Sequence, residues 1–108
     1  MKKKLALELF DTLNNLYKFL RNEDTSDIEQ VMKEMQYAIK VLNEALTSEE
    51  NNIDNILVEI KEICRSFFPP HGGLTDFFIW RDDFRERKRV NEIYEKYKNK
   101  MWSLLKLL

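Results

Sequence analysis

The sequence predicts an all-α protein, an antiparallel four-helix bundle with one structured loop of proline, glycine and aromatic residues before the last helix. Two glycines and two prolines in 108 residues are too few for the tight turns of a many-stranded fold. Apolar residues recur at helical spacings of three and four over four long segments. A chain of this length buries one hydrophobic core, so residues 1–108 are expected to form a single helical domain.

The first two helices are predicted from their apolar stripes and from one capping motif. The first helix is expected from about Lys3 to Arg21, because leucines follow one face of it. This stripe comprises Leu5, Leu9, Leu13, Leu16 and Leu20. Ser26 and Glu29 have the spacing of a capping box, in which each side chain bonds the backbone of the other. The second helix is therefore expected to begin at Ser26 and to end near Thr47.

The third and fourth helices flank the irregular segment 69–80, which contains both prolines and both glycines. The third helix is predicted over residues 53–67, and Pro69-Pro70 end it because a residue before proline leaves the α region. Asp82 or Asp83 then caps a long final helix. Its apolar side comprises Phe84, Val90, Tyr94, Tyr97, Met101, Leu104 and Leu108. From Val90 onward the spacing is that of a heptad-like seam, which suits a bundle or a partner helix. The apolar turn 102–108 is expected to be buried or to form an interface.

Charge is unevenly distributed along a chain whose net charge is −1. The predicted second and third helices carry an acidic belt that includes Glu49, Glu50 and Asp54. This belt is either a solubilising face or a surface that steers a basic partner. The basic run 81–89 fits nucleic acid, but acidic residues among the cations also permit ion pairs within the helix. Nucleic acid is therefore not the partner that the sequence favours.

Few residues are available for catalysis or for a metal. One cysteine and one histidine do not supply the ligands of a zinc site, and no nucleotide-binding glycine motif occurs. His71 lies near Cys64 and Asp76 in sequence, so a catalytic pair is conceivable, but a histidine after two prolines is more typical of a loop. We therefore expect no enzyme activity, no cofactor and no metal, and we expect Cys64 to be a buried core residue.

Membrane insertion and secretion are not indicated. No apolar run approaches the roughly 18 residues of a membrane helix. Lys2, Lys3 and Lys4 precede a short apolar stretch, but Glu8 and Asp11 interrupt it before a signal peptide can form. The sequence therefore predicts a cytoplasmic protein with no membrane partner.

Residues 77–81, Phe-Phe-Ile-Trp-Arg, are the strongest candidates for a binding site. Large aromatic residues and arginine are enriched at interface hot spots. The segment is either a lid over the end of the bundle or an anchor for a partner. The candidate partner-binding residues are Phe77, Phe78, Trp80, Arg81, Arg85, Glu49, Glu50 and Asp54.

The chain resembles small helical immunity or antitoxin proteins of bacterial toxin systems. The resemblance rests on the lysine- and glutamate-rich helical pattern and on the segment Pro69-Pro70-His71-Gly72-Gly73-Leu74 with residues 77–83 after it. The resemblance implies a non-enzymatic cytoplasmic protein that binds one cognate toxin domain and inhibits it. The alternative is a small bacterial or phage regulatory factor that contacts nucleic acid or self-assembles through its last helix. A homodimer is a further possibility, because the seam of that helix suits a two-fold interface.

Overall fold

The computed structural model describes residues 2–48 and 53–108 of the chain. The helices are α1 (Lys2–Leu20), η1 (Ser26–Ile28), α2 (Glu29–Thr47), α3 (Ile53–Arg65), α4 (Gly73–Asp76) and α5 (Phe84–Leu107). η1 is a single 3₁₀ turn, and α4 is four residues long. No strand occurs in residues 2–48 and 53–108, so the prediction of an all-α protein is confirmed.

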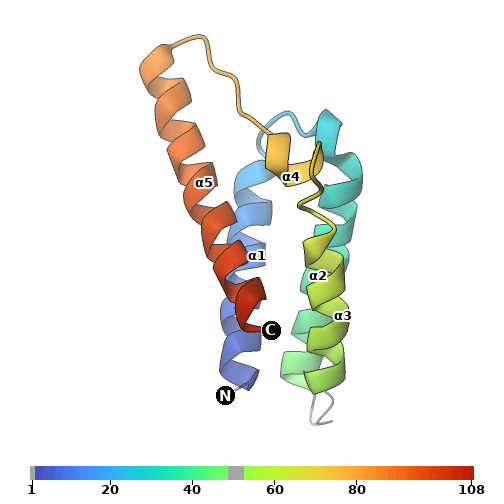
Figure 1. Cartoon of the computed structure of the whole chain (residues 1–108). Coiled ribbons are helices and arrows are strands. Elements are labelled where there is room, and N and C mark those ends of the chain that lie inside the picture. The colour runs from blue at the N-terminus through green and yellow to red at the C-terminus, as the bar shows by residue number, and fades with distance from the viewer. Residues whose placement is uncertain (1, 49–52) are drawn as a thin grey trace.

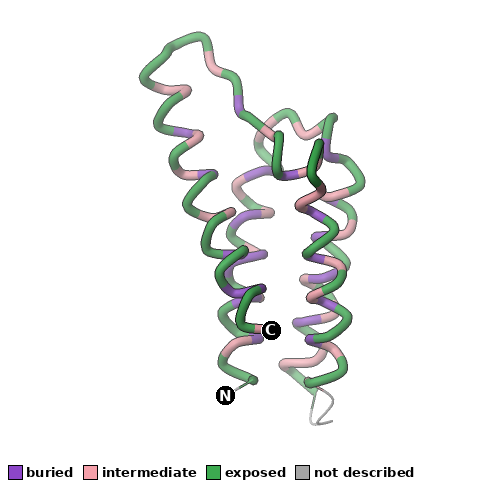
Figure 2. The backbone as a smooth tube through the Cα atoms, viewed as in Figure 1, coloured by how far each residue is buried: buried purple, intermediate pink, exposed green. Residues whose placement is uncertain are grey.

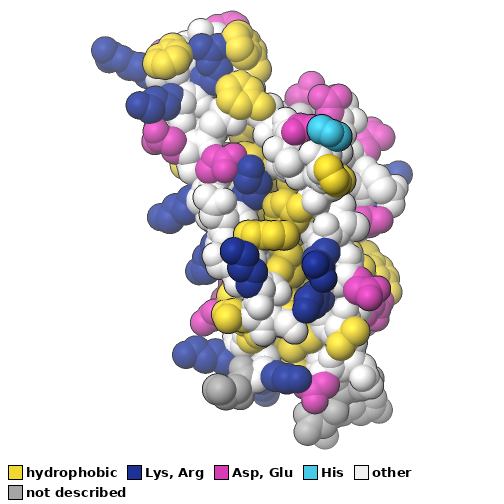
Figure 3. Space-filling model, viewed as in Figure 1, with side chains coloured by type: hydrophobic (Ala, Val, Ile, Leu, Met, Phe, Trp, Pro, Cys, Tyr) yellow, Lys and Arg dark blue, Asp and Glu magenta, His cyan; other side chains and the backbone are white. Residues whose placement is uncertain are grey.

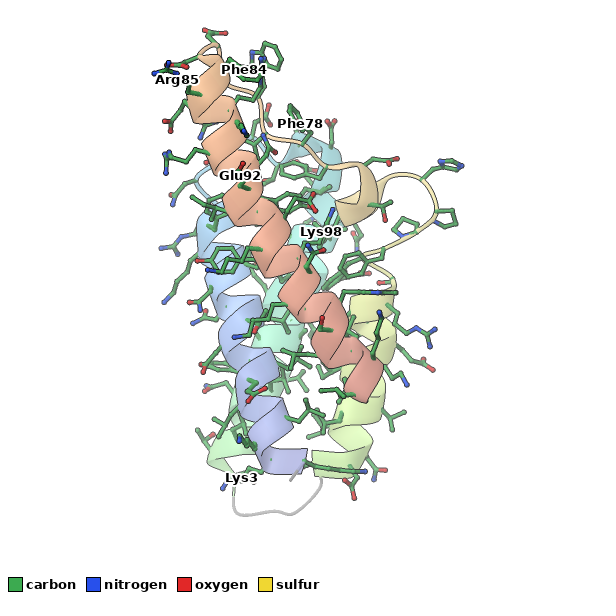
Figure 4. All side chains as sticks on the ribbon, turned by 60° about the vertical axis from the view of Figure 1, so that its left-hand side comes forward. Lys3, Phe78, Phe84, Arg85, Glu92 and Lys98 are labelled. Carbon is green, nitrogen blue, oxygen red and sulfur yellow. The ribbon has the colours of Figure 1, made fainter. Side chains whose placement is uncertain are left out.

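The long helices lie lengthwise in a molecule of 49 × 22 × 21 Å (Figure 1). α1 packs along both α2 and α5, and α2 packs along α3. α3 meets α5 over a shorter stretch. The N-terminal end of α5 projects beyond the neighbouring helices, and the segment after α4 runs to this end (Figures 1 and 4). This projecting end carries the site described below.

The hydrophobic core forms where the apolar stripes of the long helices face one another (Figure 2). Leu9, Leu13, Leu16 and Leu20 have no exposed surface, which confirms the leucine stripe predicted for the first helix. The other helices contribute Met32, Met35, Ala38, Leu42, Leu57, Ile60, Cys64, Val90, Tyr94, Met101, Leu104 and Leu105. Burial of this apolar surface is the main force that holds the helices together.

The capping box predicted at Ser26 is wrong. The Ser26 backbone N–H donates to Asp24 Oδ1 at 3.1 Å, and Ser26 lies in the 3₁₀ turn that precedes α2. Ile28 is 3% exposed with a φ of −130°, so its insertion into the core interrupts the α-helical backbone. α2 therefore begins at Glu29, where no side chain caps it. Hydrogen bonds from the Ser26 side chain and backbone lower the pKa of Asp24.

The predicted cap of the last helix is confirmed at Asp83. Asp83 Oδ1 accepts from the backbone N–H of Arg85 at 2.8 Å and of Glu86 at 3.5 Å. The placement of Phe84 on the apolar side is wrong, because its side chain is 67% exposed. Phe84 lies in the first turn of α5, on the end that projects beyond the core.

The apolar turn at the end of α5 is partly buried, and the interface expected there stays a prediction. Leu104 and Leu105 are buried, whereas Trp102 and Leu107 are 40% and 70% exposed.

Among the helices of residues 2–48 and 53–108, none is both long and apolar enough to cross a bilayer.

Candidate protein-binding surface

Residues 77–83 form an extended segment between α4 and α5, which we call the strap. Successive side chains of an extended backbone point to opposite sides. Phe77 packs edge-on against Tyr94 with ring centroids 5.5 Å apart, and Ile79 is buried. Phe78 and Trp80 are 58% and 64% exposed. Phe77 and Ile79 therefore fit the lid interpretation. Of the four large apolar side chains of the strap, Phe78 and Trp80 are the two that are available to a partner.

The side chain of Asn91 fixes the strap to α5. Its Oδ1 accepts from the backbone N–H of Ile79 at 2.9 Å, and its Nδ2 donates to the Ile79 carbonyl at 2.7 Å. Nδ2 also donates to the Arg87 carbonyl at 2.8 Å. One amide thus replaces the pairing that a neighbouring strand would give Ile79. This arrangement sets which side chains of the strap face outward.

An ion pair between Arg81 and Glu23 holds the other part of the strap. The guanidinium lies 2.7 Å and 2.8 Å from the two carboxylate oxygens, and the Glu23 side chain is only 11% exposed. Both contacts come from one nitrogen, Nη2, so the two carboxylate oxygens share one charged donor group. Arg81, a predicted partner-binding residue, is therefore engaged within the protein and ties the strap to the loop after α1.

The short helix α4 is held beneath the strap by a buried hydrogen bond. The Tyr94 hydroxyl, which has no exposed surface, donates to the Leu74 carbonyl at 2.7 Å. Burial raises the pKa of this hydroxyl. Gly73 has a φ of +54°, and a Cβ atom there would lie 2.7 Å from the Phe67 carbonyl oxygen. Glycine is thus required where α4 passes close to the end of α3.

The exposed aromatic side chains gather with Arg87 at the projecting end of α5. The Arg87 guanidinium carbon lies 4.2 Å from the Trp80 ring centroid and 5.5 Å from that of Phe84. Hydrophobic side chains stand beside Lys and Arg at this end of the molecule (Figure 3), and Phe78 and Phe84 lie on it in Figure 4. We call Phe78, Trp80, Phe84 and Arg87 the aromatic corner.

A shallow groove of about 570 Å³ runs from the aromatic corner along α5. It is lined by Phe78, Phe84, Arg87, Lys88, Asn91, Glu92, Glu95, Lys96 and Asn99. Aromatic faces lie at one end of the groove, followed along its length by the cations Arg87 and Lys88, the carboxylates Glu92 and Glu95, and the cation Lys96. Arginine stacked on aromatic rings is also pre-organised, so less conformational entropy is lost on binding.

The structure separates the predicted binding residues. Phe78, Trp80 and Arg85 lie at the projecting end, and Arg85 is exposed beside Phe84 (Figure 4). Asp54 lies at the opposite end of the molecule, where its carboxylate is 3.1 Å from Lys2 Nζ. Glu49 and Glu50 fall outside the described residues. An interface that includes both Asp54 and the strap is therefore not supported.

Sequence reasoning missed two members of the aromatic corner. Phe84 and Arg87 are three residues apart and hence on one face of α5, next to the strap that carries Trp80. That spacing is a usable signal, but the helical pattern predicts Phe84 on the apolar side of the helix. Asn91 gave no signal, because nothing in a sequence pattern identifies a helical asparagine that binds a distant backbone.

Each residue considered for catalysis has its own environment or hydrogen bond in the structure. His71 is exposed, while Cys64 has no exposed surface and its burial raises the thiol pKa to about 12. The hydroxyl of Thr75 donates to the Pro69 carbonyl, and the carboxylate of Asp76 accepts from the Gly72 backbone. No group of three His, Cys, Asp or Glu side chains that suits a metal ion occurs in residues 2–48 and 53–108.

Comparison with known proteins identifies no relative: no family model, no curated protein and no solved structure matches this chain.

Proposed function

We propose that this chain is a non-enzymatic protein-binding module whose contact surface is the aromatic corner and the groove beside it. The observation that carries this proposal is the exposure of Phe78, Trp80 and Phe84 at one end of the molecule, each more than half exposed. Exposed apolar patches rimmed by charged residues are typical of protein interaction sites. Tryptophan and arginine are the residues most enriched at the energetic centres of such sites.

We further propose that α1, α2, α3 and α5 form one antiparallel four-helix bundle that acts as a rigid support for this surface. The packing of α1 along α2 and α5, and of α2 along α3, supports this arrangement. The Asn91 and Arg81 contacts then hold the strap in the geometry that a partner meets. A pre-organised surface loses less entropy on binding than a flexible loop.

For the partner, we propose a cognate toxin domain that the chain binds and inhibits in the cytoplasm, as the resemblance to small helical immunity or antitoxin proteins implies. Such inhibition requires a large contact surface and no catalytic group. The aromatic corner supplies the hot spot that the partner needs. The exposed acidic face of α2 and α3 then steers a basic partner.

The basic run 81–89 supports protein binding better than nucleic-acid binding. Arg81 is paired with Glu23, Arg89 is paired with Glu86, and Arg87 lies over aromatic rings. Only Arg85 and Lys88 of the run remain for phosphate contacts, and affinity for nucleic acid depends on the number of such contacts.

The test is affinity capture from the native host with wild-type protein and the double variant Phe78→Ala/Trp80→Ala. Both side chains are exposed, so the variant should keep its helical circular dichroism while it loses a stoichiometric protein partner. Tyr37→Ala is the matched control, because Tyr37 is a 51% exposed aromatic residue on α2. Co-expression of the captured partner, with and without this chain, then measures inhibition of its toxicity.

Three outcomes would contradict the proposal. Retention of the partner by Phe78→Ala/Trp80→Ala would place the interface elsewhere. Capture of nucleic acid with a steep salt dependence would favour the regulatory alternative. Light scattering that gives a dimer and no other partner would favour self-assembly through α5.

A further inference from the structure

Two adjoining pits lie between α3 and the C-terminal half of α5, and the first residues of α1 also line the larger one. The larger has a volume of about 300 Å³ and the smaller about 150 Å³. Lys61 and Arg65 line both, so the pits meet at these two side chains. Their combined size falls within the range of small-molecule sites, roughly 300–1,000 Å³. We call them the α3–α5 pits.

Four cationic side chains line the α3–α5 pits, and three of them have no partner among the described residues. Lys61, Arg65 and Lys106 form no ion pair and no side-chain hydrogen bond within residues 2–48 and 53–108. Lys2 is paired with Asp54, and Glu62 is the other acidic side chain that the described residues contribute to the lining, so the described lining side chains, four cations and two carboxylates, sum to +2. In Figure 3, Lys and Arg side chains face one another across hydrophobic side chains in the lower half of the view.

The larger pit also has an apolar wall. The apolar residues of its lining are Leu5, Leu57, Val58, Leu107 and Leu108. Val58 and Leu107 are 63% and 70% exposed, which leaves apolar surface in water that a ligand would cover. Trp102 lines the smaller pit, and its contact with Phe68, at 5.2 Å between ring centroids, restrains the indole.

We propose that the α3–α5 pits bind a small amphiphilic anion, a carboxylate that carries an unbranched acyl chain. The acyl chain covers the apolar wall of the larger pit, and the carboxylate lies between Lys61, Arg65 and Lys106. A guanidinium binds a carboxylate through two parallel hydrogen bonds, and the ammonium groups add point charges. A free inorganic anion engages only the cations, and a neutral chain only the apolar wall, so both parts of the ligand contribute.

The test uses Trp102 as the reporter. The chain has two tryptophans, and Trp80→Phe leaves Trp102 as the only one. Decanoate is titrated below its micelle concentration, with decanol and inorganic phosphate as partial ligands. The expected result is a saturable change in Trp102 fluorescence with decanoate, and affinity at least roughly tenfold weaker for decanol and for phosphate.

Two variants locate the site. Lys61→Met/Arg65→Met keeps the aliphatic stems and removes the charges, and Val58→Glu places a carboxylate on the exposed apolar wall. Each should weaken decanoate binding by at least about tenfold, whereas Lys40→Met, a surface change on α2, leaves it unchanged. Absence of saturable binding, equal affinity for decanol, equal affinity for phosphate, or unchanged binding by either site variant would overturn the proposal. Circular dichroism verifies that each variant remains helical.

Discussion

Replacement of Asn91 by alanine should detach the strap from α5 and destabilise the protein measurably. The change removes three hydrogen bonds of 2.7–2.9 Å, two to Ile79 and one to Arg87. Each is worth about 1 kcal/mol, and the Ile79 amide is left without a partner in a partly buried position. Alanine recovers roughly 0.5 kcal/mol of helix propensity. The expected loss in the free energy of unfolding is therefore about 2.5 kcal/mol, or a decrease in Tm of roughly 10 °C.

Urea denaturation followed by circular dichroism measures this loss, and hydrogen exchange reports the Ile79 amide directly. Asn99→Ala is the matched control, because Asn99 is exposed on the same helix and gains the same helix propensity. The Asn91 variant should be less stable than this control, and the Ile79 amide should exchange faster. Equal stability of the two variants, with unchanged protection of that amide, would refute the role of Asn91.

Three further predictions follow from other contacts. Arg81→Met leaves the mostly buried carboxylate of Glu23 without its partner and should lower the free energy of unfolding, measured by urea denaturation, by roughly 2 kcal/mol. Recovery of that loss when Glu23→Gln is added would confirm the pair. Asp83→Ala should cost about 1 kcal/mol of thermal stability, whereas Asp83→Asn should retain most of it, because asparagine also caps helices; equal losses would contradict a capping role. Cys64 should resist a thiol reagent at pH 8 until urea unfolds the protein, and rapid native labelling would contradict its burial. Because the pKa of the Cys64 thiol is about 12 in the folded protein and 9.0 as its reference value, the contribution of the thiol to stability is complete below pH 9 and should decline as pH rises toward 12. Urea denaturation at several pH values would measure this decline.

The helices were predictable because helical periodicity is a local property of the sequence. The leucine stripe of α1 and the Asp83 cap of α5 depend on residues within a few positions of each other, and both were predicted correctly. Ser26 was misplaced because the burial of Ile28, a tertiary effect, overrides a local capping pattern.

The candidate site was only partly predictable because its contacts join distant residues. Aromatic composition was enough to select the strap, but the inward and outward alternation depends on its extended backbone. Glu23 and Arg81 are 58 positions apart, and no periodicity links them. Phe84 is predicted on the apolar side of the last helix because helical spacing does not reveal that α5 extends past its neighbours.

The contact between α1 and α5 has a consequence for the order in which the protein matures. Phe19 and Tyr97 lie on these two helices with ring centroids 5.8 Å apart, although most of the chain separates them. A ribosome releases α1 long before α5, so the side of α1 that contacts α5 has no partner helix until α5 emerges. The nascent chain is therefore most prone to aggregation just before α5 emerges, and slow translation of that last segment would prolong the exposure.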